Sequence, residues 1–407
     1  MTRKRLVVVG SGGRPFREYA LKAMSRRADL LLLSSAELSW EKPYVADFRR
    51  CRVDDVDTLV ELTHGLAPDG LLTYDERLVL TVAGAAARIG VAHTAPEAVR
   101  LCKDKSALRR RLAEAGLGPV RFAVVETVPE AVDATALIGY PVVCKPLALG
   151  GSIGVVRADD ERELVEAFEV AATARADDGT KSAIAGVLIE EYLAGPEYSV
   201  DCVVWEGTPR PVVVAEKTVG YPPYFEELGH VVPGGPHPDL DAAIQLVLDA
   251  HQAVGLDRLV THSEVKLTAD GPRIVEINVR LAGDLIPYLG TLSSGVDVAA
   301  AAADVAVGQA PDLTVTRSRV ASITMIYPAQ ALRVDGVRLR RDPSAYAGLD
   351  QLTTFLPPGT EVRLPPEAFL SRVGFAVVTG PDREECLARR AVIDSDIVVD
   401  GMPLSGG

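Results

Sequence analysis

The sequence predicts a protein of mixed α/β and α+β class, with a parallel sheet at its start and smaller mixed units after it. Strand and helix patterns alternate over residues 1–95, which is typical of a parallel sheet. A glycine-rich loop follows a buried strand near residue 145, and two strands between residues 264 and 280 alternate polar with apolar side chains. With 407 residues, the chain is long enough for two to four domains.

Bulk composition excludes several classes of protein. The net charge of −13 argues against nucleic acid as a main partner, because that role needs a basic surface. The apolar run Leu6–Val9 is too short for the core of a signal peptide, and no stretch reaches the roughly 18 apolar residues of a membrane span. The cysteines are scattered without a CxxC pair, so we expect reduced thiols in a cytoplasmic protein: Cys51, Cys102, Cys144, Cys202 and Cys386.

Residues 1–95 are predicted to form the first domain. Its strands alternate with helices, so the sheet should be parallel and doubly wound. We place the strands at Leu6–Val9, Asp29–Leu33 and Gly70–Thr73, and the helices at Phe16–Arg27 and Val56–Leu62.

The loop at residues 10–13 reads GSGG and follows the first strand. It has half of a dinucleotide-binding fingerprint, which is a weak signal without the full GxGxxG pattern. One interpretation is a tight turn from strand to helix. The other is a contact between backbone N–H groups and a small molecule or phosphate at the start of the helix.

Residues 96–190 are predicted to contain two connecting helices and a small α/β unit. The helices end at Gly116 and Gly118, since glycine is a common helix stop. The expected helices are Pro96–Cys102, Ser106–Ala115 and Glu161–Ala174; the expected strands are Phe122–Val125, Val142–Lys145, Gly154–Val156 and Gly186–Glu190; Asp177–Ser182 is expected to be a polar, mobile loop.

Residues 191–310 and 311–407 are predicted to form two further units. The first has long strands and a helix before the polar strand pair, and an alanine-rich helix after it. The second begins with a strand and closes with strand, helix and strand. We expect Glu197–Trp205, Arg210–Lys217, helix Asp239–Val254 and helix Val296–Val307 in the first unit, and Val320–Ile326, Gly374–Val378, helix Arg383–Ile393 and Ile397–Val399 in the second.

Two features before residue 160 point to phosphate binding. Lys145 stands directly before the loop Gly150-Gly151-Ser152-Ile153-Gly154. Glycines leave a backbone free to wrap phosphate with N–H groups, and a lysine supplies a point charge. Lys105 lies 40 residues before Lys145; alone, it suggests only a solvated charge. A flexible hairpin with an exposed lysine is the alternative for the loop.

Glu190 and Glu197 flank a bend between two strands, in the sequence EEYLAGPE. Such a hinge can offer backbone groups to an adenine and a carboxylate to ribose hydroxyls. A surface turn with acidic residues is the alternative.

The strand pair at residues 264–280 carries the strongest chemical signal. Glu276, Asn278 and Arg280 alternate with apolar residues, so on a strand they share one face, and Glu264 lies on the preceding strand. Two carboxylates and an amide are oxygen ligands that Mg²⁺ prefers, usually together with substrate phosphates. The arginine suits a phosphate or a developing anion. A hairpin with one solvated polar face is the alternative.

Taken together, these motifs resemble the ATP-grasp superfamily over roughly residues 1–310. The resemblance implies ATP held between two α+β subdomains behind a Rossmann-like domain. It implies residues 1–95 as this N-terminal domain, 96–190 as the glycine-rich lid subdomain with its connecting helices, 191–310 as the large subdomain and 311–407 as a small C-terminal α+β domain.

The resemblance also implies roles for the motif residues. Lys105 and Lys145 would bind phosphates, and Gly150, Gly151 and Ser152 would close over them. Arg280 would stabilise an acyl phosphate and the oxyanion that follows. The residues implied at the adenine and ribose are Glu190, Glu191, Tyr192, Leu193 and Glu197. The residues implied as ligands of two Mg²⁺ ions, or of Mn²⁺ as a substitute, are Glu264, Glu276 and Asn278.

The segment Lys217–Val232 reads as a loop with Pro222-Pro223 and carries Glu227 and His230. It resembles the ATP-grasp L-amino acid ligases, in which the matching Glu lies near a metal and the matching His near the reacting groups. A loop histidine with a structural hydrogen bond is the alternative.

Asp284 lies four residues after Arg280, and the sequence pattern assigns no oppositely charged partner to it. We expect it, with Gly283 and His262, on the substrate side, where Asp284 would recognise a cationic amino group. A helix N-cap is the alternative for Asp284.

The resemblance implies an ATP-dependent carboxylate–amine ligase that joins an amino acid to another amino acid or amine, as a homodimer. Two alternatives stay open: a carboxylase-type enzyme of biotin or purine metabolism that uses bicarbonate, and a nucleotide-binding protein without catalysis.

Overall fold

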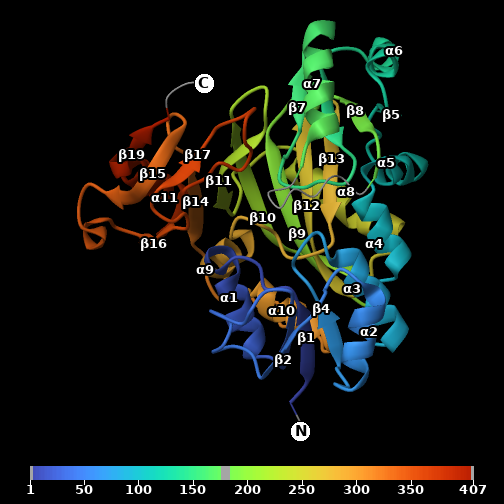
Figure 1. The fold of residues 1–407 in the computed structure, drawn as a ribbon, viewed down its shortest axis with the longest axis vertical. Coiled ribbons are helices and arrows are strands. Elements are labelled where there is room, and N and C mark those ends of the chain that lie inside the picture. Colours follow the sequence, from blue (N-terminus) through green and yellow to red (C-terminus); the bar gives the residue numbers. More distant parts are fainter. Residues whose placement is uncertain (1–2, 176–183, 405–407) are drawn as a thin grey trace.

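The computed structural model describes residues 3–175 and 184–404. The expected polar loop Asp177–Ser182 lies outside these residues. Three regions surround a central sheet (Figure 1): the N-terminal domain below it, a small sheet with helices above it, and the C-terminal unit at its side. No described helix combines the length and the hydropathy needed to cross a membrane.

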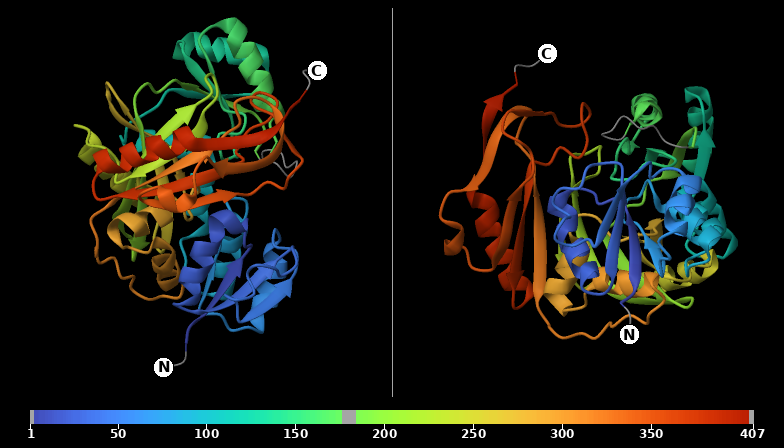
Figure 2. Two further views of the ribbon diagram at one scale, coloured as in Figure 1. Left: turned by 90° about the vertical axis from the view of Figure 1, so that its left-hand side faces the viewer. Right: turned by 60° about the horizontal axis from the view of Figure 1, so that its bottom comes forward.

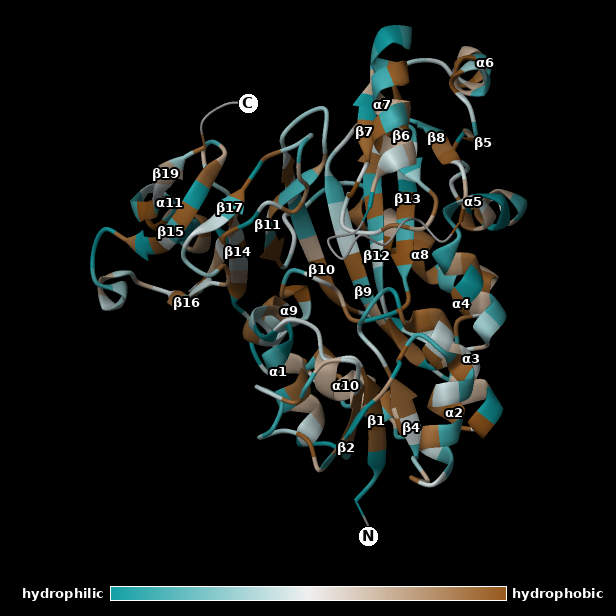
Figure 3. Ribbon diagram, in the orientation of Figure 1, coloured by the Kyte–Doolittle hydropathy of each residue, from teal (hydrophilic) through white to brown (hydrophobic). Residues whose placement is uncertain are grey.

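The N-terminal domain has the predicted parallel sheet, in strand order β3-β2-β1-β4. Its strands are mostly hydrophobic along their length because both faces are covered (Figure 3). Strand β3 and helix α3 were not predicted. The elements are β1 (Arg5–Val9), α1 (Arg14–Ser25), β2 (Asp29–Ser34), β3 (Asp47–Arg50), α2 (Val56–His64), β4 (Gly70–Leu72) and α3 (Val79–Ile89).

The next region forms a small antiparallel sheet, β5-β8-β6-β7, which we call the lid sheet. Helices α6 and α7 pack on it around Leu164 and Ile189. Helix α6 was not predicted. The elements are α4 (Pro96–Lys103), α5 (Lys105–Glu114), β5 (Phe122–Val125), α6 (Val128–Ile138), β6 (Val142–Pro146), β7 (Val156–Ala158), α7 (Glu161–Thr173) and β8 (Val187–Glu191).

The central sheet has eight strands in the order β13-β12-β9-β10-β11-β14-β18-β16. It runs past residue 310, because β14 pairs with β11, β18 pairs with β14, and β16 pairs with β18. Helix α8 covers one face, while α9 and α10 cover part of the other. The elements are β9 (Glu197–Trp205), β10 (Thr208–Gly220), β11 (Glu226–Val232), α8 (Leu240–Val254), β12 (Leu259–Thr268), β13 (Gly271–Asn278), α9 (Ile286–Ser294), α10 (Val298–Ala306), β14 (Val320–Ile326), β16 (Leu349–Thr354) and β18 (Gly374–Gly380).

Reading Lys217–Val232 as a loop was wrong. Strand β10 runs to Gly220 and β11 begins at Glu226, so only the turn around Pro222-Pro223 is irregular. Strand β11 pairs with β10 on one side and β14 on the other. The two prolines lack N–H donors and suit the turn, whereas pairing on both sides fixes the following residues as a strand.

The C-terminal unit adds a second, three-stranded sheet in the order β17-β15-β19. Helix α11 lies along the strands β14 and β18, as the red helix in the left view of Figure 2 shows. The remaining elements are β15 (Leu332–Leu339), the short 3₁₀ helix Pro343–Ala345, β17 (Thr360–Val362), α11 (Arg383–Asp396) and β19 (Ile397–Pro403).

Candidate active site

One face of the central sheet carries rows of polar side chains. Directly opposed residues on antiparallel strands point to the same face. Glu264 on β12 lies opposite Glu276 on β13 and Ser199 on β9. In the next row, Lys266 lies opposite Glu197, Glu197 opposite Lys217, and Lys217 opposite His230. Strand pairing therefore brings together residues that are far apart in the sequence, such as Glu197 and Lys266.

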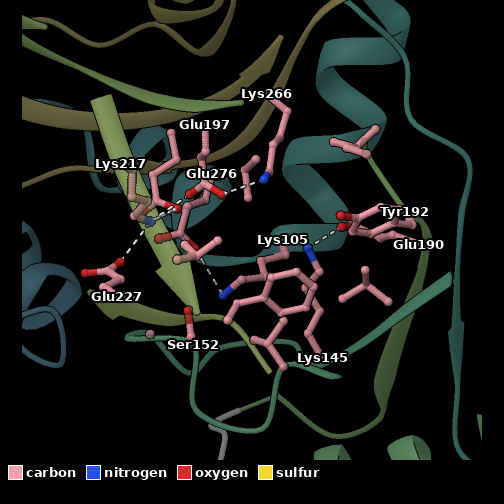
Figure 4. Close-up of a pocket in the computed structure, with 18 of the residues that line it drawn as sticks. Lys105, Lys145, Ser152, Glu190, Tyr192, Glu197, Lys217, Glu227, Lys266 and Glu276 are labelled. Carbon is pink, nitrogen blue, oxygen red and sulfur yellow. Dashed lines mark hydrogen bonds and ion pairs between the residues drawn. The ribbon is translucent and has the colours of Figure 1, made fainter. Parts of the chain in front are cut away.

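A pocket of about 780 Å³ lies between this face and the lid sheet (Figure 4). It gathers every residue expected at the nucleotide, and both acidic residues expected at the metal. The lining includes Lys105, Lys145, Gly150, Gly151, Ser152, Glu190, Glu191, Tyr192, Leu193, Glu197, Lys217, Phe225, Glu227, Glu264, Lys266 and Glu276.

Glu190 is buried at the back of the pocket between two cations. Lys145 and Arg109 both form ion pairs with its carboxylate. Burial opposes ionisation, but these two cations outweigh it and lower the pKa of Glu190 to about 2. Arg109 also donates to the carbonyls of Ile274 (2.6 Å) and Val275 (2.8 Å). Glu190 thus anchors Lys145 and ties the lid sheet to β13.

The glycine-rich loop lies over the pocket and touches other regions. Lys105 Nζ donates to the Leu149 carbonyl at 2.7 Å, next to the loop. Gly151 has φ of +69°, and a Cβ there would lie 3.2 Å from a methyl carbon of Leu370 in the C-terminal unit. Ser152 has φ of +57°, a strained value for a residue with a side chain. The loop region is therefore in contact with Lys105 of α5 and with the C-terminal unit.

Lys217 is an internal cation that the sequence did not single out. Its Nζ lies 2.7 Å from Glu197, 2.8 Å from Glu227 and 3.0 Å from Glu264 (Figure 4). Burial disfavours its charge, yet the three carboxylates outweigh burial and raise its pKa well above the ordinary value. Four carboxylates share this face, and Lys217 offsets their repulsion.

The expected metal ligands lie side by side. Asn278 Nδ2 donates to Glu276 Oε1 at 2.7 Å, and Glu276 lies opposite Glu264 across β12 and β13. Burial would raise the pKa of Glu276, but Lys105, Asn278 and other neighbours lower it to about 2. The two carboxylates and the amide oxygen fit a hard divalent cation. Ser199 Oγ, opposite Glu264, is buried and lacks a hydrogen-bond partner among the described residues.

Arg280 is not a strand residue, because β13 ends at Asn278. Its guanidinium still reaches back to Asn278 Oδ1 at 3.4 Å and donates to the Leu281 carbonyl at 2.9 Å. Arg280 Nε pairs with Glu76 of the N-terminal domain at 2.8 Å. Glu76, which no motif indicated, thus fixes Arg280 beside the expected metal ligands.

A second cluster adjoins the pocket through Glu227. His230 Nε2 lies 3.3 Å from Asp284 and 3.8 Å from Glu227. Burial opposes the charge of His230, but hydrogen bonds to both acids outweigh it and raise its pKa. Arg372, from the C-terminal unit, pairs with Asp284 and lies 3.8 Å from Glu227.

Two expectations about Asp284 were therefore wrong. It is not an unpartnered acid, because Arg372 and His230 both contact it. It also caps no helix, since α9 begins after Leu285 and has no side-chain cap. Asp284 has φ of +49°, a strained value for a residue with a side chain. Its carboxylate is held on this turn by Arg372 and His230.

His262 lies two residues before Glu264, so the two side chains are on the same face of β12. Its Nδ1 is 2.7 Å from Asp201 and its Nε2 is 3.4 Å from Glu264. Burial disfavours the charged imidazole, but Asp201 outweighs burial and raises the pKa of His262 to about 10. His262 contacts a proposed metal ligand rather than the pocket itself.

Comparison with known proteins identifies the central part of the chain. Residues 138–288 match the ATP-grasp domain family. The chain is 25% identical over 404 residues to the uncharacterized protein y4rH of Sinorhizobium fredii, covering 97% of this chain and 83% of that one. It is 26% identical to alanine–anticapsin ligase of Bacillus subtilis, covering 64% of this chain and 58% of the ligase. The chain thus spans little over half of that ligase's length.

Solved structures share the fold. The L-amino acid ligase from Bacillus licheniformis superposes with a TM-score of 0.84 at 20% identity, covering 99% of this chain and 100% of that one. The biotin carboxylase domain of Hydrogenobacter thermophilus 2-oxoglutarate carboxylase, solved as a dimer with MgADP and bicarbonate, gives 0.72 at 16% identity and covers 99% and 92%. Residues 138–288 therefore match the ATP-grasp domain family, and the chain shares the fold of the L-amino acid ligase structure along nearly its whole length.

Proposed function

We propose that this protein is an ATP-dependent ligase that joins a carboxylate to an amine and releases ADP and phosphate. The supporting observation is the polar face of the central sheet. It presents oxygen ligands for Mg²⁺ at Glu264, Glu276 and Asn278, directly beside Arg280 and under a loop bordered by Lys105. An anionic acid can approach the γ-phosphate only where cations offset the repulsion.

The nucleotide would lie between the lid sheet and the central sheet. Lys105 and Lys145 would neutralise its phosphates, and Gly150, Gly151 and Ser152 would cover them with backbone N–H groups. Glu197 would hold the ribose. For the adenine we propose the hinge Glu190, Glu191, Tyr192 and Leu193.

Glu264, Glu276 and Asn278 would hold two Mg²⁺ ions, or Mn²⁺ in their place. The metals would supply positive charge at the phosphates when bound. The chain's own contribution at Glu276 is to keep that carboxylate ionised. Lys105, 3.6 Å from Glu276, and Lys217 both lower its pKa.

The proposed reaction has two steps. A carboxylate oxygen of the acid attacks the γ-phosphorus, and ADP leaves, giving an acyl phosphate. The amine nitrogen then attacks the acyl carbon, loses a proton, and phosphate leaves as the amide forms. Arg280 would stabilise the anion in both steps. Glu227 and His230 would orient the amine for this attack.

Gly283, Asp284 and His262 are proposed on the substrate side. Asp284, whose partner in the structure is Arg372, would also accept a hydrogen bond from a cationic amino group of one substrate. Replacing Asp284 with Ala should change the range of amino acids that support phosphate release. An identical substrate profile in the variant would remove Asp284 from substrate recognition.

A matrix of single and paired amino acids tests the function. Phosphate release is measured with ATP and Mg²⁺, and products are weighed by mass spectrometry. We expect release that needs one acid and one amine, with a product mass equal to their sum minus water. Release stimulated by bicarbonate alone would favour the carboxylase alternative, which the biotin carboxylase likeness keeps open. ATP binding without turnover on any pair would favour a non-catalytic protein.

We also propose that the enzyme is a cytoplasmic homodimer. All five cysteines are free, which suits a reducing compartment. The dimeric biotin carboxylase domain supports a dimer by its likeness alone. Light scattering on the purified protein should give twice the 43.2 kDa of one chain, and a single-chain mass would refute the dimer.

A further inference from the structure

Arg17, on helix α1 of the N-terminal domain, is a partly buried cation without an acidic partner. Its Nη1 donates to the Ala282 carbonyl at 3.0 Å, and its guanidinium lies 5.1 Å from the centre of the Tyr74 ring. Within residues 3–175 and 184–404, no carboxylate oxygen lies within 4 Å of it.

The other cations around the site are all paired. Arg280 contacts Glu76, and Arg372 contacts Asp284. The lysines behave in the same way: Lys105 pairs with Glu276, Lys145 with Glu190, Lys217 with Glu197, Glu227 and Glu264, and Lys266 with Glu197. Arg17 thus stands out as a positive charge that the described part of the chain leaves unmatched.

Keeping this charge is unfavourable in the protein alone. Burial lowers the pKa of Arg17 and outweighs the opposite effects of Tyr19, Tyr74 and Asp284, while the nearby Arg280 lowers it further. A buried charge normally has a partner, because removing an ion from water is costly unless another group compensates its charge. An anionic ligand would supply the missing partner.

The glycine loop after β1 makes room for this side chain. Gly12 has φ of +66°, and a Cβ there would lie 3.0 Å from Arg17 Cγ. A glycine at this position therefore lets Arg17 fold under the loop and stack on Tyr74. This explains the glycine at position 12 without a dinucleotide.

The guanidinium lies next to the proposed reaction centre. Ala282, which it contacts, stands between Arg280 and Asp284 in the sequence. Next to it, a Cβ at Gly283 would meet no heavy atom within 4 Å, so open space adjoins this turn. Arg280 and Asp284 both act electrostatically on Arg17, so an anion bound beside Arg17 would lie near the turn that carries them.

We propose that Arg17 binds the carboxylate of the amine substrate, which is therefore an amino acid and not a simple amine. This inference rests on the proposed ligase function. The carboxylate of the acid substrate is consumed beside Arg280. An acceptor amino acid keeps its own carboxylate throughout the reaction, and the site must neutralise that charge. Arg17 supplies a fork of N–H donors that matches carboxylate geometry.

Steady-state kinetics of Arg17→Gln and Arg17→Lys test this proposal. The probes are the amine substrate found in the amino acid matrix and the amide of the same amino acid, which lacks the charge. We expect Arg17→Gln to raise KM for the amino acid about 10- to 100-fold, the size of a lost charge-assisted contact. KM for the amide and for the acid substrate should change little, and Arg17→Lys should recover part of the loss.

Arg14→Gln is the matched control, because Arg14 lies on the same helix but is exposed and pairs with Glu18 at 2.9 Å. It should leave both KM values unchanged. Equal losses with the amino acid and its amide would make Arg17 a structural residue and overturn the proposal. A raised KM for the acid substrate would overturn it too. A wild-type enzyme silent across the matrix would instead count against the ligase function itself.

Discussion

At the scale of single residues, the site is a balance of buried charges. Glu190 and Glu276 are both ionised to about pH 2, each because cations outweigh burial. Lys217 lies among three carboxylates. An arrangement of this kind keeps oxygen ligands deprotonated before a metal arrives. The metal then meets a site that needs no proton release from these acids.

Glu276→Gln should weaken metal binding, since it replaces an ionised ligand with a neutral amide. We expect the Mg²⁺ concentration for half-maximal phosphate release to rise at least about 10-fold, the usual effect of disturbing a ligand shell. A Mg²⁺ titration of the variant and of Glu361→Gln, which changes an exposed acid, measures this. Identical Mg²⁺ curves for Glu276→Gln and the wild type would exclude Glu276 as a ligand.

Several of these residues gave a signal in the sequence, and others gave none. Glu276 and Asn278 alternate on a strand, so their common face followed from the period of two. Lys217 ends a predicted strand, and its partners appear only when the hairpin register is known. Glu76 and Arg372 come from segments without a motif, and tertiary packing alone brings them to Arg280 and Asp284.

At the scale of elements, the lid sheet and the central sheet are joined by Arg109. This buried side chain on α5 pairs with Glu190 on β8 and donates to two carbonyls of β13. The position of Lys145 in the pocket depends on the same carboxylate. One acid therefore supports both the architecture and the phosphate site.

Glu190→Gln should destabilise the protein by about 3–5 kcal/mol, because it leaves two buried cations without their anion. Glu191→Gln is the neighbouring control. Its partner Arg121 is mostly exposed, so its loss should cost about 1 kcal/mol or less. Thermal unfolding of both variants checks the difference. Equal midpoints for the two would show that the buried pair contributes no more than a surface pair.

Helix α8 is joined to β12 by His251, which is fully buried. Its Nδ1 donates to the Val247 carbonyl and its Nε2 lies 2.7 Å from Thr261 Oγ1. Burial lowers the pKa of His251 to about 4. Unfolded His takes up a proton near pH 6.5, so protons favour the unfolded state below that pH.

The stability that comes from keeping His251 neutral in the folded protein is fully present above pH 6.5. It is lost as the pH falls toward 4, by about 3 kcal/mol in all. His251→Gln should lack this part of the acid sensitivity. Urea unfolding at pH 7 and pH 4.5 measures it. An unchanged difference between the two pH values in the variant would assign the sensitivity to other groups.

At the scale of the whole molecule, the sequence predicted the main helices and strands better than it predicted how the units pack together. The alternating elements of the first domain and the positions of β9, β14 and α11 followed from local patterns. The short edge strand β3 and the helices α3, α6 and α9 did not, because their patterns are brief or uniformly apolar. Strand β11 was missed because the preceding prolines suggested a loop.

The central sheet also crosses from the proposed large subdomain into the C-terminal unit. That unit brings Leu370 against Gly151 and Arg372 against Asp284. The N-terminal domain therefore contributes Arg17 and Glu76 to the surroundings of the site, and the C-terminal unit contributes Arg372. No local pattern could have predicted this convergence, since it depends on how the units pack.

The proposed reaction activates a carboxylate by phosphate transfer from ATP. The most direct test follows ¹⁸O from carboxyl-labelled amino acids into inorganic phosphate, using the pair that supports turnover. An acyl phosphate leaves one carboxyl oxygen on the phosphate, so we predict one ¹⁸O in each phosphate released. Phosphate that carries no label, with turnover proceeding, would mean that water and not the acid attacks ATP, and would contradict the account.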